Sequence, residues 1–128
     1  MNDEMENEGA AKLMIVFRTA PYGSIYAYEG LENVVMTAAY EQDLTVLFID
    51  DGVLALKKGM DSSATAIKDF SPTFKALEPV YDVEKIFIDG ASLESRGLTL
   101  DDLIIQPEVI EAGKVEQLMV EQRNFMMF

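Results

Sequence analysis

Apolar residues along this chain gather in short unbroken runs, separated by segments in which they recur every three or four positions. The runs 13–17 and 44–49 show no alternation of apolar and polar residues, which is typical of strands buried on both faces of a parallel sheet. The pattern predicts five strands in all: Leu13–Phe17, Leu44–Ile49, Glu84–Ile88, Asp102–Gln106 and Phe125–Phe128. We expect Pro107 to end the fourth, because proline cannot donate a ladder hydrogen bond.

The segments between these runs carry helical spacing. Between Ile25 and about Glu41, apolar residues recur in steps of three and four, which predicts an amphipathic helix. Further helices are predicted at Val53–Leu56, from Ser71, at Ser92–Arg96 and across Ala112–Gln122. Strands that alternate with helices predict an α/β fold. We expect a single-domain three-layer sandwich over residues 12–128, with a mostly parallel sheet of about five strands, preceded by a disordered acidic tail at 1–11.

Composition removes much chemistry from this framework. The 128 residues include no cysteine and no histidine. A thiolate nucleophile and a Cys-based zinc site are therefore impossible, and the commonest general base is missing. The glycines match neither dinucleotide-binding nor phosphate-loop spacing. We assign no catalytic, cofactor or metal residue, and we expect the chain not to be an enzyme by itself.

The charge balance bears on partners and location. Twenty-three acidic residues against ten basic ones give a formal net charge of −13, which repels a phosphate backbone and argues against direct nucleic-acid binding. The longest clean apolar run, 13–17, is far shorter than the roughly 20 residues that cross a bilayer. The acidic beginning, with Asp3 and Glu4, is unlike a signal peptide. We expect a soluble, cytoplasmic protein.

Three aspartates follow predicted strands and form the main candidate site. Asp50 and Asp51 follow the second strand, and Asp89 follows the third. Because parallel strands end at one edge of their sheet, these carboxylates could form a magnesium or proton-transfer cluster. Alternatively, Asp51 caps a helix and Asp50 or Asp89 orders a turn. Adjacent aspartates point in different directions, so we favour the structural interpretation.

Aromatic and methionine residues suggest a different role. Tyrosines gather around the first turn and helix, and the chain closes on consecutive apolar residues: Tyr22, Tyr26, Tyr28, Tyr40 and Phe125–Phe128. Apolar residues on both faces of a last strand leave apolar surface exposed unless something covers it. Methionine and tyrosine are common at subunit contacts. We therefore favour assembly with other subunits over a cofactor site, although ordinary core packing remains an alternative.

Four segments of the chain form a recognisable set: Ala20–Glu29, Leu47–Val53, Asp69–Leu77 and Ser92–Leu103. Together they resemble the DsrF/TusC branch of the DsrE-like sulfur-relay family. The similarity runs from about Leu13 to Leu103 and resumes at Phe128. The resemblance implies a DsrEFH-like, flavodoxin-like α/β fold. The first segment and the Asp50-Asp51-Gly52 turn are more similar to DsrF of sulfur oxidisers than to TusC of tRNA thiolation.

The resemblance also implies a function. It implies a heterohexamer with DsrE/TusD-like and DsrH/TusB-like subunits, which serves a DsrC/TusE-like sulfur carrier. In that family a cysteine near the end of the strand corresponding to 84–88 accepts persulfide sulfur. Here the neighbourhood reads Ile88-Asp89-Gly90-Ala91-Ser92, so the resemblance implies a non-catalytic structural subunit, in sulfur oxidation or tRNA 2-thiouridine synthesis.

Candidate partner contacts are Tyr22, Tyr26, Asp50 and Asp51. The alternative function is a stand-alone domain that binds a small ligand or Mg²⁺ through Asp50, Asp51 and Asp89.

Overall fold

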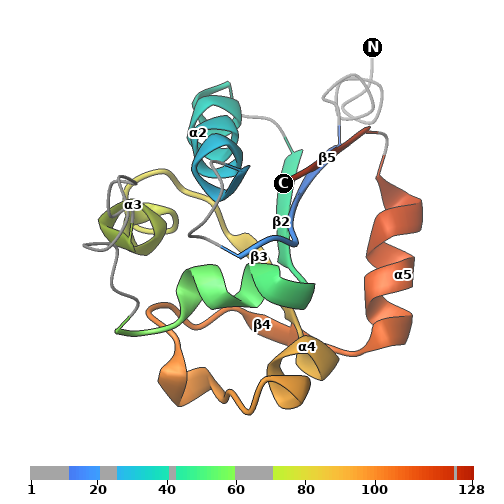
Figure 1. Ribbon diagram of the computed structural model, residues 1–128. Helices are drawn as coiled ribbons and strands as arrows, with labels where there is room; N and C mark the ends of the chain where they lie inside the picture. The colour runs from blue at the N-terminus through green and yellow to red at the C-terminus, as the bar shows by residue number, and fades with distance from the viewer. Residues whose placement is uncertain (1–11, 21–25, 41–42, 60–70, 123) are drawn as a thin grey trace.

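The order of strands and helices along the chain follows the predicted alternation. A computed structural model describes residues 12–20, 26–40, 43–59, 71–122 and 124–128. Its elements, in chain order, are β1 (Lys12–Phe17), α2 (Tyr26–Ala39), β2 (Asp43–Phe48), the 3₁₀ helix η1 (Asp50–Leu56), α3 (Ser71–Ala76), β3 (Lys85–Asp89), α4 (Gly90–Ser95), the 3₁₀ helix η2 (Leu100–Asp102), β4 (Glu108–Ile110), α5 (Ala112–Glu121) and β5 (Asn124–Met127) (Figure 1). The expected tail at 1–11 lies outside the described residues.

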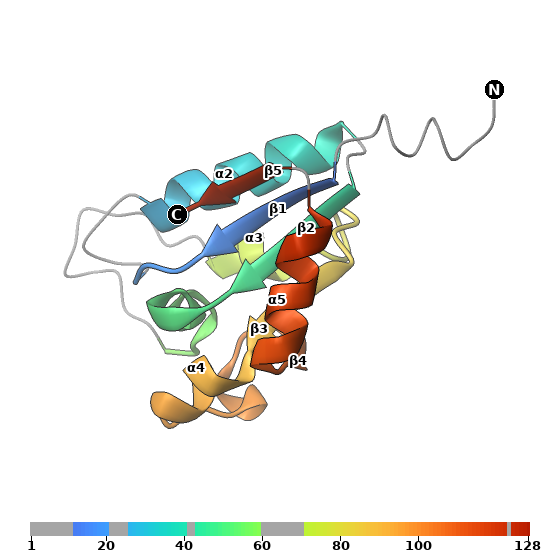
Figure 2. The same cartoon turned by 90° about the vertical axis from the view of Figure 1, so that its right-hand side faces the viewer.

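The five strands form one sheet in the order β4-β3-β2-β1-β5, and every neighbouring pair is parallel. Helices α2 and α3 lie on one face of this sheet and α5 lies on the other (Figure 2). The predicted single α/β domain with a parallel sheet of five strands is therefore confirmed. All carboxyl ends of the strands point to one edge, which is where ligands and partners of such sheets usually meet.

Strand β1 illustrates why the sheet is buried on both faces. Ile15 and Phe17 belong to the larger core cluster beneath α2 and α3, whereas Met14 and Val16 pack in a second cluster with Leu118 of α5. Successive side chains of a strand point to opposite faces, so an unbroken apolar run fills both layers. The continuous apolar pattern of this segment is thus explained by its position between two layers of helices.

Three phenylalanine rings pack together in the part of the larger cluster that lies near the carboxyl ends of the strands. The rings of Phe17 and Phe48 stack with centroids 4.9 Å apart, and Phe74 of α3 meets both edge-on at 5.7 and 5.8 Å. Offset stacking and edge-on contact are the arrangements that aromatic quadrupoles favour. The contacts fix α3 against β1 and β2.

The predicted strand at 102–106 is wrong. Thr99 and Asp102 form a capping box around η2, and the amide of Ile104 donates to the carbonyl oxygen of Leu56 at 2.7 Å. These backbone groups are therefore satisfied by turns and by η1, not by β3. The strand instead follows Pro107, which is buried immediately before β4, where its missing N–H removes no ladder hydrogen bond.

Several boundaries also move. The helix predicted at 53–56 is a 3₁₀ helix that begins earlier, at Asp50, and α4 begins at Gly90, two residues before the predicted start. Gly97, which follows the Arg96 C-cap of α4, has φ = +67°, the left-handed conformation in which glycine commonly ends a helix. Phe128 lies beyond β5, but its amide still donates to the Val16 carbonyl oxygen at 2.8 Å.

Gly52 allows η1 to pass directly over the end of β1. A Cβ atom at this position would lie 1.8 Å from the carbonyl oxygen of Phe17 and 2.7 Å from the amide nitrogen of Arg18. Both obstacles are backbone atoms, so a larger residue cannot be accommodated by a side-chain rotation. That same Phe17 oxygen accepts a hydrogen bond from the amide of Ile49 at 2.9 Å, so moving it would also disturb the start of η1.

We predict that Gly52→Ala lowers the free energy of unfolding by about 1–3 kcal/mol, the range typical of overpacking in a dense interior. Urea denaturation followed by circular dichroism measures this change. Gly113→Ala is the matched control, because nothing lies within 4 Å of its Cβ position in α5. The control should raise the free energy of unfolding by about 0.5–1 kcal/mol, because alanine is more favourable than glycine inside a helix. A Gly52→Ala protein as stable as the wild type would contradict the proposed close approach.

Candidate functional site

The carboxyl ends of β1, β2 and β3 bring together six polar side chains, which we call the rim. They come from the residue after β1, the start of η1, the end of β3, and α4 with its C-cap: Arg18, Asp50, Asp51, Asp89, Ser92 and Arg96. The parallel sheet places them at one edge although they are far apart in sequence. The rim is the part of the molecule in which the predicted aspartates meet.

Ser92 is the buried centre of the rim. Its hydroxyl donates to Asp89 Oδ2 at 2.6 Å and accepts the backbone N–H of Asp50 at 2.8 Å. The same Asp89 oxygen caps α4 by accepting the Ser92 amide at 3.2 Å. One hydroxyl therefore joins the end of β3 to the end of β2, and it uses both its donor and an acceptor position to do so.

The two adjacent aspartates diverge. Asp50 has φ = +52°, a left-handed conformation that aspartate tolerates better than most residues. Its carboxylate lies 3.4 Å from the Arg18 guanidinium, whereas Asp51 Oδ1 accepts from Nε and Nη2 of Arg96 at 3.1 and 2.8 Å. Both carboxylates are more than half exposed. These ion pairs are therefore worth little in stability, and both carboxylates stay within reach of another molecule.

The geometry favours the structural interpretation of the three aspartates. Asp89 caps a helix, and Asp50 and Asp51 each face a different arginine. Among the described residues, no group of three acidic side chains is arranged to hold a metal ion. The prediction that Asp51 caps a helix is wrong, because its carboxylate pairs with Arg96 and the N-cap of η1 is Ile49.

The tyrosine candidates are only partly located. Tyr22 lies outside the described residues, and Tyr26 is the first residue of α2 and is exposed.

Sequence reasoning missed Arg18 and Arg96 as rim residues. The position of Arg18 could have indicated its role. Arg18 directly follows one buried strand and Asp50 comes two residues after the next, so a parallel sheet brings their opposite charges to the same edge.

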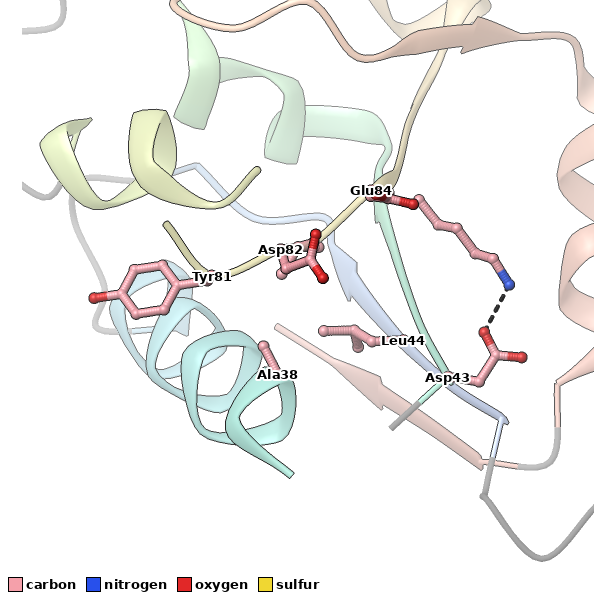
Figure 3. Close-up of a pocket in the computed structure, with 8 residues that line it drawn as sticks. Ala38, Asp43, Leu44, Tyr81, Asp82 and Glu84 are labelled. Carbon is pink, nitrogen blue, oxygen red and sulfur yellow. Dashed lines mark hydrogen bonds and ion pairs between the residues drawn. The ribbon is translucent and has the colours of Figure 1, made fainter. Parts of the chain in front are cut away.

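A cavity of about 370 Å³ lies at the opposite end of the sheet, beside the start of β2 and β3. The ion pair between Lys85 Nζ and Asp43, 2.6 Å long, stands on one side of it, and Tyr81 and Asp82 stand on the other (Figure 3). This cavity is separate from the rim and contains none of the predicted site residues.

Comparison with known proteins identifies the family. The family model described as the DsrE/DsrF-like family matches residues 11–128. The chain belongs to the DsrE/DsrF-like family. The resemblance inferred from the four sequence segments is thereby confirmed.

Curated members of the DsrE/DsrF-like family show which branch this chain resembles. It is 43% identical over 129 residues to the intracellular sulfur oxidation protein DsrF of Allochromatium vinosum, covering 90% of this chain and 94% of that protein. It is 34% identical to a TusC homolog of Vibrio parahaemolyticus, covering 92% and 99% of the two chains. It is 40% identical to TusC of Escherichia coli, covering 82% and 84%.

Solved structures agree in fold. The ychN protein of E. coli superposes with a TM-score of 0.77 at 21% identity, covering 92% of this chain and 99% of that one. The protein MTH1491 of Methanobacterium thermoautotrophicum superposes with a TM-score of 0.64 at 15% identity, covering 91% and 99%. In the described part of the chain, every helix is too short or too polar to span a bilayer.

We predict that Ser92→Ala destabilises the fold by about 1–3 kcal/mol, because it removes the acceptor of the Asp50 amide and the donor to Asp89. Ser95→Ala is the control, since Ser95 is exposed and its hydroxyl donates to the Ser92 carbonyl at the longer distance of 3.2 Å. It should change the free energy of unfolding by less than about 0.5 kcal/mol. Equal midpoints for the two variants in urea denaturation would refute the central role of Ser92.

Proposed function

We propose that this chain is a non-catalytic structural subunit of a cytoplasmic sulfur-relay complex, of the DsrF type. The proposal is supported chiefly by the 43% identity to an intracellular sulfur oxidation protein over nearly its whole length. The similarity to TusC proteins supports the same type of subunit, with tRNA thiolation as the other pathway. Both pathways pass persulfide sulfur from one protein to the next.

The absence of thiols from this chain supports a role without sulfur transfer of its own. A persulfide forms on a cysteine sulfur, and the thiolate is the nucleophile in such exchanges, but the chain contains no cysteine. At the end of β3, where the family resemblance implies a cysteine in the sulfur-bearing subunit, this chain has the Asp89–Ser92 hydrogen bonds. The sulfur-accepting cysteine would then belong to a DsrE/TusD-like partner.

In this proposal the rim is the surface on which the other proteins dock. Asp50 and Asp51 carry exposed carboxylates at the edge where the strands end, and Tyr26 is exposed at the start of α2. Because both carboxylates are exposed, each can also meet a basic group of a docking protein, and complementary charges speed such an encounter. In this proposal Tyr22, Tyr26, Asp50 and Asp51 contact either a related subunit or the DsrC/TusE-like carrier.

Co-expression with a DsrE/TusD-like and a DsrH/TusB-like subunit tests the proposal. We predict a complex that contains two copies of each chain, seen as a single assembly by native mass spectrometry. After treatment with a persulfide donor, the added sulfur mass should appear on the DsrE/TusD-like chain and never on this one. A chain that stays monomeric in the presence of every paralogue would defeat the proposal.

The rim contribution is tested by Asp50→Asn combined with Asp51→Asn. We predict that the assembled complex then binds the DsrC/TusE-like carrier several-fold more weakly at low salt, and that the difference shrinks above roughly 0.5 M salt because exposed charges are screened. Glu111→Gln at the N-cap of α5 with Glu116→Gln within the helix is the control, since this pair removes the same net charge from exposed positions away from the rim. Equal losses for both pairs would show that only total charge matters.

A further inference from the structure

Strand β5 is an edge of the sheet with one side already paired. Within the described residues its only strand neighbour is β1. The Phe128 amide donates to Val16, and the Phe128 carbonyl oxygen accepts from Arg18 at 2.7 Å. Backbone groups alternate in direction along a strand. Met126 therefore also faces β1, whereas the N–H and C=O groups of Phe125 and Met127 face outward.

Three of the four side chains of β5, those of residues 125–127, are apolar, and they are exposed on both faces of the sheet. The register pairs Met14 with Phe125 and Ile15 with Met126, so Phe125 and Met127 share the α5 face and Met126 shares the α2 face. Their exposed fractions are 43%, 36% and 51% for residues 125, 126 and 127. Proteins usually protect an open sheet edge with charged side chains or proline, and β5 contains neither.

Helix α2 extends this apolar surface. Tyr28, Glu32, Met36 and Tyr40 are spaced four apart, and all four are exposed. Residues four apart share a helix face. A groove of about 420 Å³ joins the end of α2 to β5 and is lined by Met36, Tyr40, Phe125 and Met126. The open backbone edge and the groove are therefore continuous.

We propose that a β-strand from a related subunit of the complex pairs with the outward edge of β5, and that its apolar side chains enter the groove between β5 and α2. This inference rests on the proposed function and names the surface through which the subunit is held. Outward N–H and C=O groups select an extended backbone, and apolar side chains on both faces of β5 select a strand that has apolar residues on both of its faces.

Charge selects a less acidic chain as the occupant. Two copies of this chain would bring formal charges of −13 together, and like charges at an interface oppose docking. Among Tyr28, Glu32, Met36 and Tyr40, the acidic residue is Glu32. Its hydrogen bond with the Tyr28 hydroxyl raises the pKa of Tyr28, and its negative charge adds a smaller contribution in the same direction. Glu32 is exposed one turn before Met36, a residue of the groove, and its carboxylate favours a basic residue on the incoming strand.

The chain's own residues 1–11 fit the groove poorly. They are rich in Asp, Glu, Asn and Gly, which are depleted in strands. They also bring four further acidic groups towards Glu32. A strand from another subunit can bond the outward N–H and C=O groups, place apolar side chains in the groove and bring a basic residue to Glu32.

The test uses the co-expressed complex with Met127→Pro or Phe125→Lys in this chain. Met127→Pro removes an outward N–H and no hydrogen bond to β1, and Phe125→Lys places a charge on the edge. We expect each to reduce the yield of the assembled complex at least tenfold while the isolated chain keeps its cooperative unfolding transition. Val80→Lys is the control, because Val80 is 70% exposed in the turn before β3, and it should assemble like the wild type.

Amide hydrogen exchange on the wild-type complex gives an independent measurement. The amides of Phe125 and Met127 should become protected on assembly, whereas that of Met126, already bonded to β1, should change little. Wild-type assembly without protection at these amides, together with normal assembly of Met127→Pro, would overturn the inference and leave the proposed function intact. Failure of the wild type to assemble would defeat both.

Two further outcomes would reassign the edge. Protection of Phe125 and Met127 in the isolated chain, dependent on its concentration, would make a second copy the occupant. Protection that is independent of concentration and lost on deleting residues 2–11 would make the chain's own N-terminal segment the occupant. Either result would overturn the inference.

Discussion

The structure depends on the close contact at the end of β1, where the Phe17 carbonyl oxygen meets the amide of Ile49 and the bare Cα of Gly52. This contact lets the chain turn from β2 into η1 without leaving the sheet edge. It also holds Asp50 in its left-handed conformation, so that its backbone amide reaches Ser92. Because the Phe17 ring stacks on Phe48 in the same place, the backbone contact and the core packing support each other.

The rim is a consequence of that geometry. Once β1, β2 and β3 end side by side, Arg18, Asp50 and Ser92 have to share a small space. The buried Ser92 hydroxyl donates to the Asp89 carboxylate and accepts the Asp50 amide, while the side chains of Arg18, Asp50 and Asp51 at the same edge are at least half exposed. The rim thus combines one buried hydroxyl with a charged border, and it owes this arrangement to three parallel strands that end at the same edge.

The sequence predicts the elements whose pattern is set by burial and misses those set by turn chemistry. Leu13–Phe17 and Leu44–Ile49 are apolar because both faces are covered, so their period is informative. The segment 102–106 contains a shorter apolar run, Leu103-Ile104-Ile105, but its backbone is bonded in the Thr99–Asp102 capping box and to the Leu56 carbonyl oxygen instead of in the sheet. The meeting of Asp50 with Asp89 near one edge followed from parallel topology. The choice of Arg18 and Arg96 as partners depends on side-chain reach, which a linear pattern does not encode.

The strand order has a consequence for how the chain folds. Strand β1 finds β2 after one helix, but its other neighbour, β5, arrives only after the chain has built β3 and β4 and crossed the whole sheet through α5. Contacts between such distant segments form late and slow the search for the native state. Until then the outer side of β1 is itself an open, highly apolar edge. Strand β5 therefore covers the open side of β1 late in folding, and its own outer side becomes the edge of the finished sheet.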